Sequence, residues 1–413
     1  MKEDTLILAQ DQYYSLDCYE TRLNNNVLVV GTSGAGKTRG VVEPNLMQAS
    51  GSYVVSDPKG NLYAKYKDYL KERGYRVVKL DFTDPANSEH YNFFDYIHST
   101  QDIVKVAHML IYLNNKGGHY DPFWDESSQL LMQACIAFLM ESDYKSERTL
   151  EYIMKLIDMC DVDEYSRSSD PSSELDKIMR FHEEKHPGSY AAKTYRKFRT
   201  GANKTLKNIM ICVTSRLGLF DSPEINELLR TDTVNIPSIG DRKTALFVVV
   251  SDTDRSLDVL ANIFFSQAMN ELCLHADKEC EGNRLPVPVR FILDDFATNV
   301  KICEFPRMIA SIRSRGISAM LMIQAESQLQ EAYGYDASTI IGNCDTYLYM
   351  GGNDVGTAKA VAERCDMPLK KILNMPVGTN WIFRRGQAPI NGRNIDLDAF
   401  TREVDEDSGW IFR

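Results

Sequence analysis

Val27-Leu28-Val29-Val30 is followed directly by Gly31-Thr32-Ser33-Gly34-Ala35-Gly36-Lys37-Thr38. The first four residues are continuously apolar, as in a strand buried on both faces. The next eight match G-x-x-x-x-G-K-T, the phosphate-binding loop (P-loop) of nucleoside triphosphatases, whose glycines let backbone N–H groups wrap a polyphosphate. Lys37 would meet the β- and γ-phosphates, and the Thr38 hydroxyl would bind Mg²⁺. We therefore expect residues 31–38 to bind ATP or GTP with Mg²⁺.

The composition is that of an ordinary globular protein, with 43% hydrophobic and 25% charged residues among 413. The nine cysteines are scattered and never form C-x-x-C, and the histidines show no metal-ligand spacing. This pattern argues against a disulfide framework or a zinc site and favours a reducing compartment. Because no apolar run approaches the length of a membrane span and no secretory signal follows Met1, we expect a cytosolic chain.

Short apolar or β-branched runs alternate with helical patterns over much of the chain, which predicts an α/β fold with a mostly parallel sheet. Further strands are expected at 53–55, 76–80, 245–250, 291–293, 319–323, 347–349 and 381–383. Strand runs vanish between about residues 99 and 235, where helical periodicity takes over. We expect a nucleotide-binding domain in two parts, 1–98 and 236–413, with an all-α domain inserted at 99–235.

Within the insertion, Asp121-Pro122 is typical of a helix start, and residues 150–157 and 173–181 also have helical patterns. The tail after Asn391 is acidic, and we expect it to be loosely ordered.

The second half of the nucleotide site is predicted at Asp294 and Asp295, which follow the apolar strand Val289–Leu293. Asp294 would hold the Mg²⁺ shell, and Asp295 would polarise the attacking water. The interval from Lys37 to Asp294 is far longer than the connections of a compact nucleotide-binding domain. The helical insertion accounts for most of that excess.

Two further polar positions flank the next strand. Gln324 comes directly after it, which suits sensing the γ-phosphate or orienting water. Arg313 and Arg315 precede it, and an arginine there could neutralise transition-state charge on a neighbouring subunit. Solvated turn and helix-end side chains are the alternative at these positions.

The net charge of −11 gives no general attraction for nucleic acid, so DNA contact requires a local patch. Residues 185–220 contain no Asp or Glu, and the aromatic residues Tyr190, Tyr195 and Phe198 are interleaved with basic ones. Such a segment suits binding of single-stranded DNA. The alternative is that the basic side chains form a solvated helix face and pair with acidic residues from elsewhere. The candidate DNA-binding residues are Lys193, Arg196, Lys197, Arg199, Lys204 and Lys207.

Together these motifs resemble the type IV coupling proteins of conjugative DNA transfer, the TraG/TraD-type ATPases. The resemblance rests on the P-loop and on further motifs in the family's order: Ser56-Asp-Pro-Lys-Gly60, Phe123-Trp124, Phe220-Asp-Ser-Pro223, Leu293-Asp-Asp-Phe-Ala297, Arg313-x-x-Gly316 and Gln324. It implies a RecA-like motor domain carrying an all-α domain and assembled as a ring, expected to be a hexamer. Such proteins use ATP to recruit a relaxase within its relaxosome and to drive single-stranded DNA into a type IV secretion channel at the cytoplasmic face of the membrane.

By matching position, the resemblance implies that Lys37 and Thr38 bind phosphate and Mg²⁺. Asp294 would be the metal-shell acid, Asp295 the catalytic acid, Gln324 the sensor and Arg313 the arginine finger acting in trans. The family usually has Asp-Glu where this chain has Asp-Asp. It also usually has an N-terminal membrane anchor, so either an anchor was removed or a partner provides the membrane link.

Two other functions stay open. One is a different ring motor, such as an FtsK/HerA-like DNA pump or a secretion ATPase for protein substrates. The other is a nucleotide-regulated docking adaptor for relaxase or effector proteins that barely hydrolyses ATP, an alternative that the shorter Asp295 side chain keeps open.

Overall fold

The computed structural model describes residues 4–112, 122–160 and 173–408. By its internal contacts the chain divides into two compact units. The α/β unit contains Met1–Thr83, Asn235–Ala261 and Ala268–Arg413, and the helical unit contains Asp84–Val234 and Asn262–Gln267. The helical unit thus begins about fifteen residues before the expected position 99, and it includes a short piece of a long helix from the second half of the chain.

Among the described residues, nine strands form one sheet in the order β11-β10-β9-β3-β8-β7-β4-β6-β5. The strands from β9 to β5 run parallel, and β10 and β11 add an antiparallel hairpin at one edge. Every predicted strand lies in this sheet, which confirms the α/β class. The strand β11 and the separate β1–β2 pair were not predicted. The strands are β1 (Thr5–Ala9), β2 (Gln12–Ser15), β3 (Val27–Val30), β4 (Ser52–Pro58), β5 (Arg76–Asp81), β6 (Thr244–Val250), β7 (Val289–Leu293), β8 (Ile317–Ile323), β9 (Thr346–Tyr349), β10 (Thr379–Arg384) and β11 (Ile390–Arg393).

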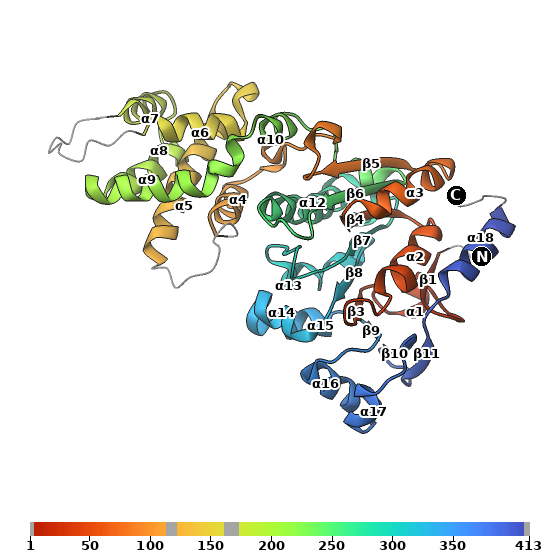
Figure 1. The fold of residues 1–413 in the computed structure, drawn as a ribbon. Coiled ribbons are helices and arrows are strands. Elements are labelled where there is room, and N and C mark those ends of the chain that lie inside the picture. Colours follow the sequence, from red (N-terminus) through yellow and green to blue (C-terminus); the bar gives the residue numbers. More distant parts are fainter. Residues whose placement is uncertain (1–3, 113–121, 161–172, 409–413) are drawn as a thin grey trace. The chain divides into compact units, whose positions relative to one another are not determined.

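Helices cover both faces of the sheet in the α/β unit, with α2, α3 and α18 on one side and α13 to α15 on the other (Figure 1). This arrangement explains why the central strands are apolar along their whole length rather than alternating. The helical segments that lie wholly or partly in this unit are α1 (Cys18–Thr21), η1 (Thr38–Val42), α2 (Glu43–Met47), α3 (Asn61–Glu72), α11 (Ser238–Asp241), α12 (Asp258–Glu279), η6 (Glu281–Asn283), α13 (Phe305–Met308), η7 (Ile312–Arg315), α14 (Glu326–Tyr333), η8 (Gly334–Asp336), α15 (Ala337–Gly342), α16 (Val355–Cys365), α17 (Leu369–Leu373) and α18 (Leu397–Ser408).

The end of the chain contributes to the core on the α2 face. Leu397, Phe400 and Val404 of α18 are buried in the same apolar cluster as strand residues such as Val29 and Met322. The expectation of a loosely ordered tail after Asn391 is therefore wrong as far as residue 408. The acids of the tail were recognised from the sequence, but the apolar side chains spaced between them hold the helix to the unit.

The buried side chain of Asn45 joins α2 to β1. It accepts a hydrogen bond from the Ile7 N–H at 3.1 Å and donates to the Ile7 carbonyl at 2.7 Å. It also donates to the Val41 carbonyl at 2.7 Å. Since Ile7 is fully buried, this amide satisfies backbone groups that water does not reach.

The described residues of the helical unit contain no strand. The helix α5 is described from Pro122 onward. Asp121, the predicted cap, lies outside the described residues, so the predicted helix start stays a prediction. Ser173 and Asp176 form a reciprocal capping box at the start of α7. The helical segments of this unit are η2 (Pro85–Asn87), η3 (Phe93–Tyr96), α4 (Thr100–Tyr112), α5 (Pro122–Glu141), η4 (Lys145–Glu147), α6 (Leu150–Asp158), α7 (Glu174–Lys185), α8 (Tyr190–Arg199), α9 (Asn203–Leu217), η5 (Gly218–Asp221) and α10 (Pro223–Leu228).

The Asn45 contact makes a testable prediction. Asn45→Ala should destabilise the protein by about 2–5 kcal/mol, because it leaves two buried backbone groups of Ile7 without partners. The measurements are the urea midpoint and the rate of amide hydrogen exchange in β1. Asn353→Ala, at an exposed position, is the control and should change stability by no more than about 0.5 kcal/mol. Unchanged exchange of the Ile7 amide in Asn45→Ala would contradict the assigned role.

Candidate nucleotide-binding site

The P-loop connects the central strand β3 to the helical segment η1–α2. Gly34 and Gly36 have φ angles of 78° and 90°, in the left-handed region where glycine carries no steric penalty. Backbone bonds hold the loop to both neighbouring strands, since Gly31 N–H donates to Ile323 of β8 and Thr32 N–H donates to Gly351 after β9. The loop is therefore fixed at the carboxyl edge of the sheet, where a phosphate can meet its backbone N–H groups.

Lys37 is directed back into the loop. Its ammonium donates to the carbonyl of Gly31 at 2.7 Å and to that of Thr32 at 3.3 Å. Burial lowers the pKa of Lys37, and the carboxylates of Asp294 and Asp295 oppose that effect. The loop carbonyls thus hold the cation where phosphate oxygens could replace them.

Thr38 and Asp294 meet, although they are 256 positions apart: the Thr38 hydroxyl donates to Asp294 Oδ2 at 2.9 Å. Burial raises the pKa of Asp294, and the bond from Thr38 is the largest opposing influence. A hydroxyl and a carboxylate are hard oxygen donors of the kind that Mg²⁺ prefers. The pair thus fits the predicted magnesium shell.

Asp295 follows in an unusual backbone conformation, with φ of 50°. Its N–H donates to Asp294 Oδ1 at 3.1 Å, and its carbonyl accepts from the N–H groups of Thr298 and Asn299. Among non-glycine residues, Asp and Asn tolerate this left-handed conformation best. The tight turn gives a physical reason for Asp, rather than Glu, at this position.

Gln324 and Arg313 lie at opposite ends of β8. Gln324 directly follows Ile323, which pairs with Val30, so it is beside the P-loop with an exposed side chain. Arg313 lies in η7 at the amino end of the strand, where its guanidinium donates to the Cys18 carbonyl at 2.9 Å. Because the seven residues of β8 span roughly 20 Å, Arg313 does not reach the P-loop of its own chain.

Two residues near the P-loop were missed as site residues. Asn394, after β11, donates to the Ala35 carbonyl at 3.1 Å and accepts from the buried Asn380 amide at 2.9 Å. This contact fixes the loop from the carboxyl-terminal hairpin. An isolated Asn after an unpredicted strand carries no motif, so the sequence offers no signal for it.

Asp57 belongs to a quoted motif but was given no role. It is buried at the carboxyl end of β4, and its carboxylate accepts from the Leu62 and Tyr63 N–H groups at 3.1 and 2.8 Å. Burial raises its pKa to about 6, with further contributions from the charges of Asp294 and Asp81. Asp57 thus caps the start of α3 and adds a carboxylate near Asp294.

A second group of metal-ligand types lies outside this site. Ligand atoms of Asp241, His275 and Cys280 are within 4.8 Å of one another. The histidine and Asp241 already satisfy each other through a contact of 2.8 Å. A hydrogen bond between α11 and α12 accounts for this grouping.

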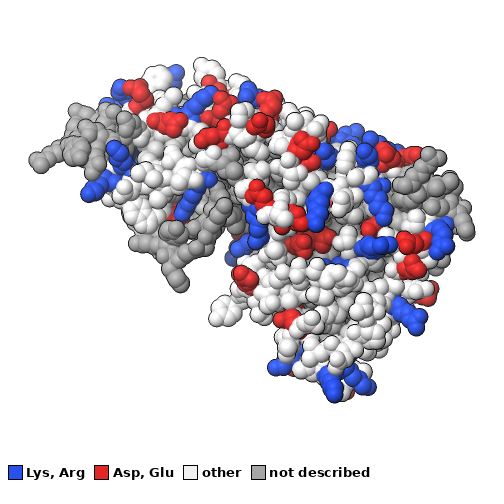
Figure 2. Space-filling model, viewed as in Figure 1, with Lys and Arg blue, Asp and Glu red and all other residues white. Residues whose placement is uncertain are grey.

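The candidate DNA-binding segment forms α8 and α9 of the helical unit. Lys193, Lys197, Lys204 and Lys207 are exposed, and no carboxylate of a described residue pairs with them. Figure 2 shows that on the face drawn, Lys and Arg are interspersed with Asp and Glu. The four lysines therefore remain available to a phosphate backbone.

The rest of the basic segment is engaged within the unit. Arg196 pairs with Glu183, and Arg199 with Asp176. Tyr195 and Phe198 are core residues with 3% of their surface exposed. The idea that these two rings stack on bases is therefore wrong, because helical periodicity turns them inward.

No helix among the described residues combines the length and hydropathy required to cross a bilayer.

The family model for "Type IV secretory system Conjugative DNA transfer" matches residues 3–367. The conjugal transfer protein TraG of Rhizobium radiobacter is 22% identical over 351 residues, covering 82% of this chain and 52% of the relative. TraG of Escherichia coli is 22% identical over 356 residues, covering 82% and 54%. The coupling protein VirD4 of Bartonella henselae is 19% identical over 384 residues, covering 89% and 57%. The chain thus spans about half the length of these curated relatives.

Solved structures show the same fold. The conjugative coupling protein TrwBdeltaN70 with sulphate has a TM-score of 0.67 at 15% identity, over 96% of this chain and 90% of that one. TrwB with ADP and Mg²⁺ has a TM-score of 0.66 at 16% identity, over the same shares. VirB4 of Thermoanaerobacter pseudethanolicus has a TM-score of 0.57 at 12% identity, over 97% and 98%. With a family model matching most of its length and a RecA-like P-loop domain, the chain belongs to the conjugative DNA transfer family of type IV secretion coupling proteins.

Proposed function

We propose that this protein is an ATP-driven coupling motor that moves single-stranded DNA toward a type IV secretion channel during conjugation. The observation that carries the proposal is the Thr38–Asp294 hydrogen bond, which completes a nucleotide site in a member of the conjugative DNA transfer family. TrwB, a structural relative, has been solved with an ATP analogue and with ADP and Mg²⁺. These complexes support the choice of ATP and Mg²⁺ as ligands.

The P-loop residues have defined tasks in this proposal. Backbone N–H groups of residues 31–38 bind the phosphates, and Lys37 exchanges its two carbonyl partners for phosphate oxygens. Thr38 and Asp294 hold Mg²⁺, which neutralises charge on the phosphates when bound. The Thr38 hydroxyl and the Asp294 carboxylate would supply the oxygen ligands of that ion.

Asp295 and Gln324 then act on the attacking water. Asp295 is close enough to Lys37 to influence its pKa, so its carboxylate belongs to the same site. It would accept a hydrogen bond from the water and polarise it, while the exposed Gln324 amide orients the water or senses the γ-phosphate.

Arg313 has its task in an assembled ring, which we propose to be a hexamer. Its place at the amino end of β8 excludes action on its own P-loop but leaves it available to a neighbouring subunit. Lys193, Lys197, Lys204 and Lys207 would contact the DNA backbone. Relaxase and channel components would be the protein partners, at the cytoplasmic face of the membrane.

The first test is ATP hydrolysis with and without single-stranded DNA, with particle mass measured in parallel. The wild-type protein should hydrolyse ATP faster when DNA is present, and Lys37→Ala should lower turnover by roughly 10²-fold or more because the phosphate cation is lost. Lys359→Ala, at an exposed position in α16, is the matched control and should match the wild type. If wild-type turnover is no faster than that of Lys37→Ala, the docking-adaptor function is correct instead.

A second test separates binding from chemistry at Asp295. Asp295→Asn tolerates the left-handed turn but removes the carboxylate, so kcat should fall by about 10²–10⁴-fold with little change in nucleotide affinity. Asp295→Glu should not raise kcat, since a longer side chain fits the φ of 50° less well. A faster Glu variant would show that the turn does not determine the choice of Asp.

A third test concerns the lysines of α9. The double variant Lys204→Gln with Lys207→Gln should weaken binding of single-stranded DNA. The plot of the logarithm of the binding constant against the logarithm of the salt concentration should become less steep, by about 0.7 for each lost phosphate contact. Lys177→Gln, an exposed lysine of α7 that pairs with Glu174, serves as the control. An unchanged salt slope in the double variant would exclude α9 from the DNA interface.

A further inference from the structure

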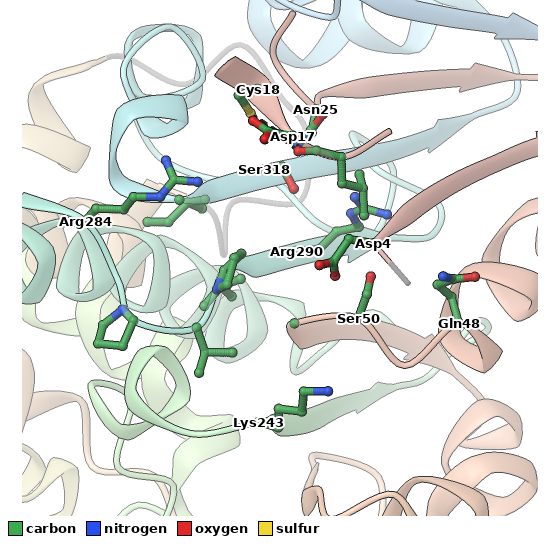
Figure 3. A pocket seen from close by; sticks show the side chains of 18 of the residues that line it. Asp4, Asp17, Cys18, Asn25, Gln48, Ser50, Lys243, Arg284, Arg290 and Ser318 are labelled. Carbon is green, nitrogen blue, oxygen red and sulfur yellow. Dashed lines mark hydrogen bonds between the residues drawn. The ribbon is translucent and has the colours of Figure 1, made fainter. Parts of the chain in front are cut away.

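A cavity of about 790 Å³ opens in the α/β unit at the amino ends of β4, β7 and β8. The P-loop, Asp294 and Gln324 follow the carboxyl ends of strands, so the cavity lies at the opposite edge of the sheet. Its walls come from α1, the connection between α2 and β4, and the residues that precede β7 and β8 (Figure 3). Its volume is in the range of sites for small molecules and cofactors.

The lining is strongly basic in a chain whose net charge is −11. It contains Arg73, Lys243, Arg284, Arg290 and Arg313, whereas its acids are Asp4 and Asp17. Among the described residues, no carboxylate oxygen lies within 4.0 Å of a charged nitrogen of those five cations. The carboxylate of Asp17 is already used at the start of α1, where it accepts from the Tyr19 and Glu20 N–H groups.

The partners of the cations are neutral. Arg313 donates to the Cys18 carbonyl at 2.9 Å, and Lys243 donates to the Ala49 carbonyl at 3.4 Å. The Arg284 guanidinium lies 5.6 Å from the centre of the Tyr19 ring. Carbonyls and rings position these side chains but leave their charges uncompensated.

Arg290 is the decisive residue because it is buried. Only 7% of its surface is exposed, and its Nε has no hydrogen-bond partner. One terminal nitrogen donates to Asn45 Oδ1 at a long 3.4 Å, an oxygen that also accepts from the Ile7 N–H. In Figure 3 its side chain lies among those of Asp4, Ser50 and Ser318. The charge of Asp4 acts on Arg290, but Asp4 forms no ion pair with it within 4.0 Å. A buried guanidinium that no carboxylate contacts is costly unless a ligand supplies the negative charge.

We propose that this cavity binds a multiply charged phosphate anion, with Arg290 at its base and Arg284 and Lys243 at its mouth. Guanidinium groups suit phosphate because they offer paired N–H donors, and several cations at one site favour a polyanion over a single carboxylate. The anion is either a free phosphorylated small molecule or the triphosphate held by the P-loop of a neighbouring copy. The second source rests on the proposed ring assembly, whereas the first does not.

Binding is measured with the P-loop disabled, by calorimetric titration of tripolyphosphate into Lys37→Ala protein. The Lys37→Ala protein should bind tripolyphosphate, and adding Arg290→Gln should weaken that binding by roughly tenfold to a hundredfold, as expected for a lost charge-assisted contact. Arg307→Gln removes an exposed arginine outside the cavity and is the matched control. Equal affinity with and without Arg290→Gln would overturn the proposal.

Arg284→Gln and Lys243→Gln keep the test decisive if Arg290→Gln fails to fold. Both residues lie at least partly exposed at the mouth, and each substitution in the Lys37→Ala background should weaken tripolyphosphate binding. An unchanged affinity in both would also overturn the proposal. Since these titrations require neither hydrolysis nor DNA, their failure is distinct from a failure of the motor function.

Mixing variants distinguishes the two sources of the anion. Lys37→Ala subunits keep Arg290, and Arg290→Gln subunits keep the P-loop. Recovery of ATP hydrolysis in the mixture, above the sum of the two proteins alone, would identify the ligand as the neighbour's triphosphate. Tripolyphosphate binding to single, unassembled chains without such recovery would identify a free phosphorylated molecule.

Discussion

A parallel sheet covered by helices on both faces leaves little room for charge except at the ends of its strands. The central strands lie between layers of helices (Figure 1) and are buried along their whole length. Polar side chains therefore collect where the strands begin and end. At the carboxyl edge lie the P-loop, Asp57, Asp294 and Gln324. At the amino edge lie Arg290 and Arg313. One edge is thus supplied with backbone N–H groups and carboxylates and the other with guanidinium groups.

This separation explains which parts of the molecule were predictable. Apolar runs predicted the strands of the large sheet that carry the site. The motifs predicted that Thr38 and Asp294 share one site despite the helical insertion between them, and the two side chains are hydrogen-bonded. Both predictions depend on strong local signals: continuous hydrophobicity and a loop that needs glycine at defined positions. The β1–β2 pair and β11 were missed because they are short, lie at the margins of the unit and carry no such signal.

The rest depends on tertiary contacts that a sequence does not display. Asn394 reaches the P-loop only because the β10–β11 hairpin brings it there. Tyr195 and Phe198 were predicted to contact DNA because basic residues surround them in the sequence, yet helical periodicity places them in the core. The left-handed backbone at Asp295 is similarly invisible, although it gives the departure from Asp-Glu a structural cause.

Asn45 offers a physical connection between the two edges. It lies in the helical segment that begins at Thr38, and its side-chain oxygen accepts from Arg290 at the cavity. The same amide holds the Ile7 backbone, so a shift of Arg290 toward an anion, if the cavity binds one as proposed, would change the bonding of a residue less than three turns from the P-loop threonine. Coupling of this kind requires two arrangements of the Asn45 bonds with similar free energy. The long 3.4 Å contact from Arg290, beside two short ones to Ile7 and Val41, identifies the bond that can exchange at least cost.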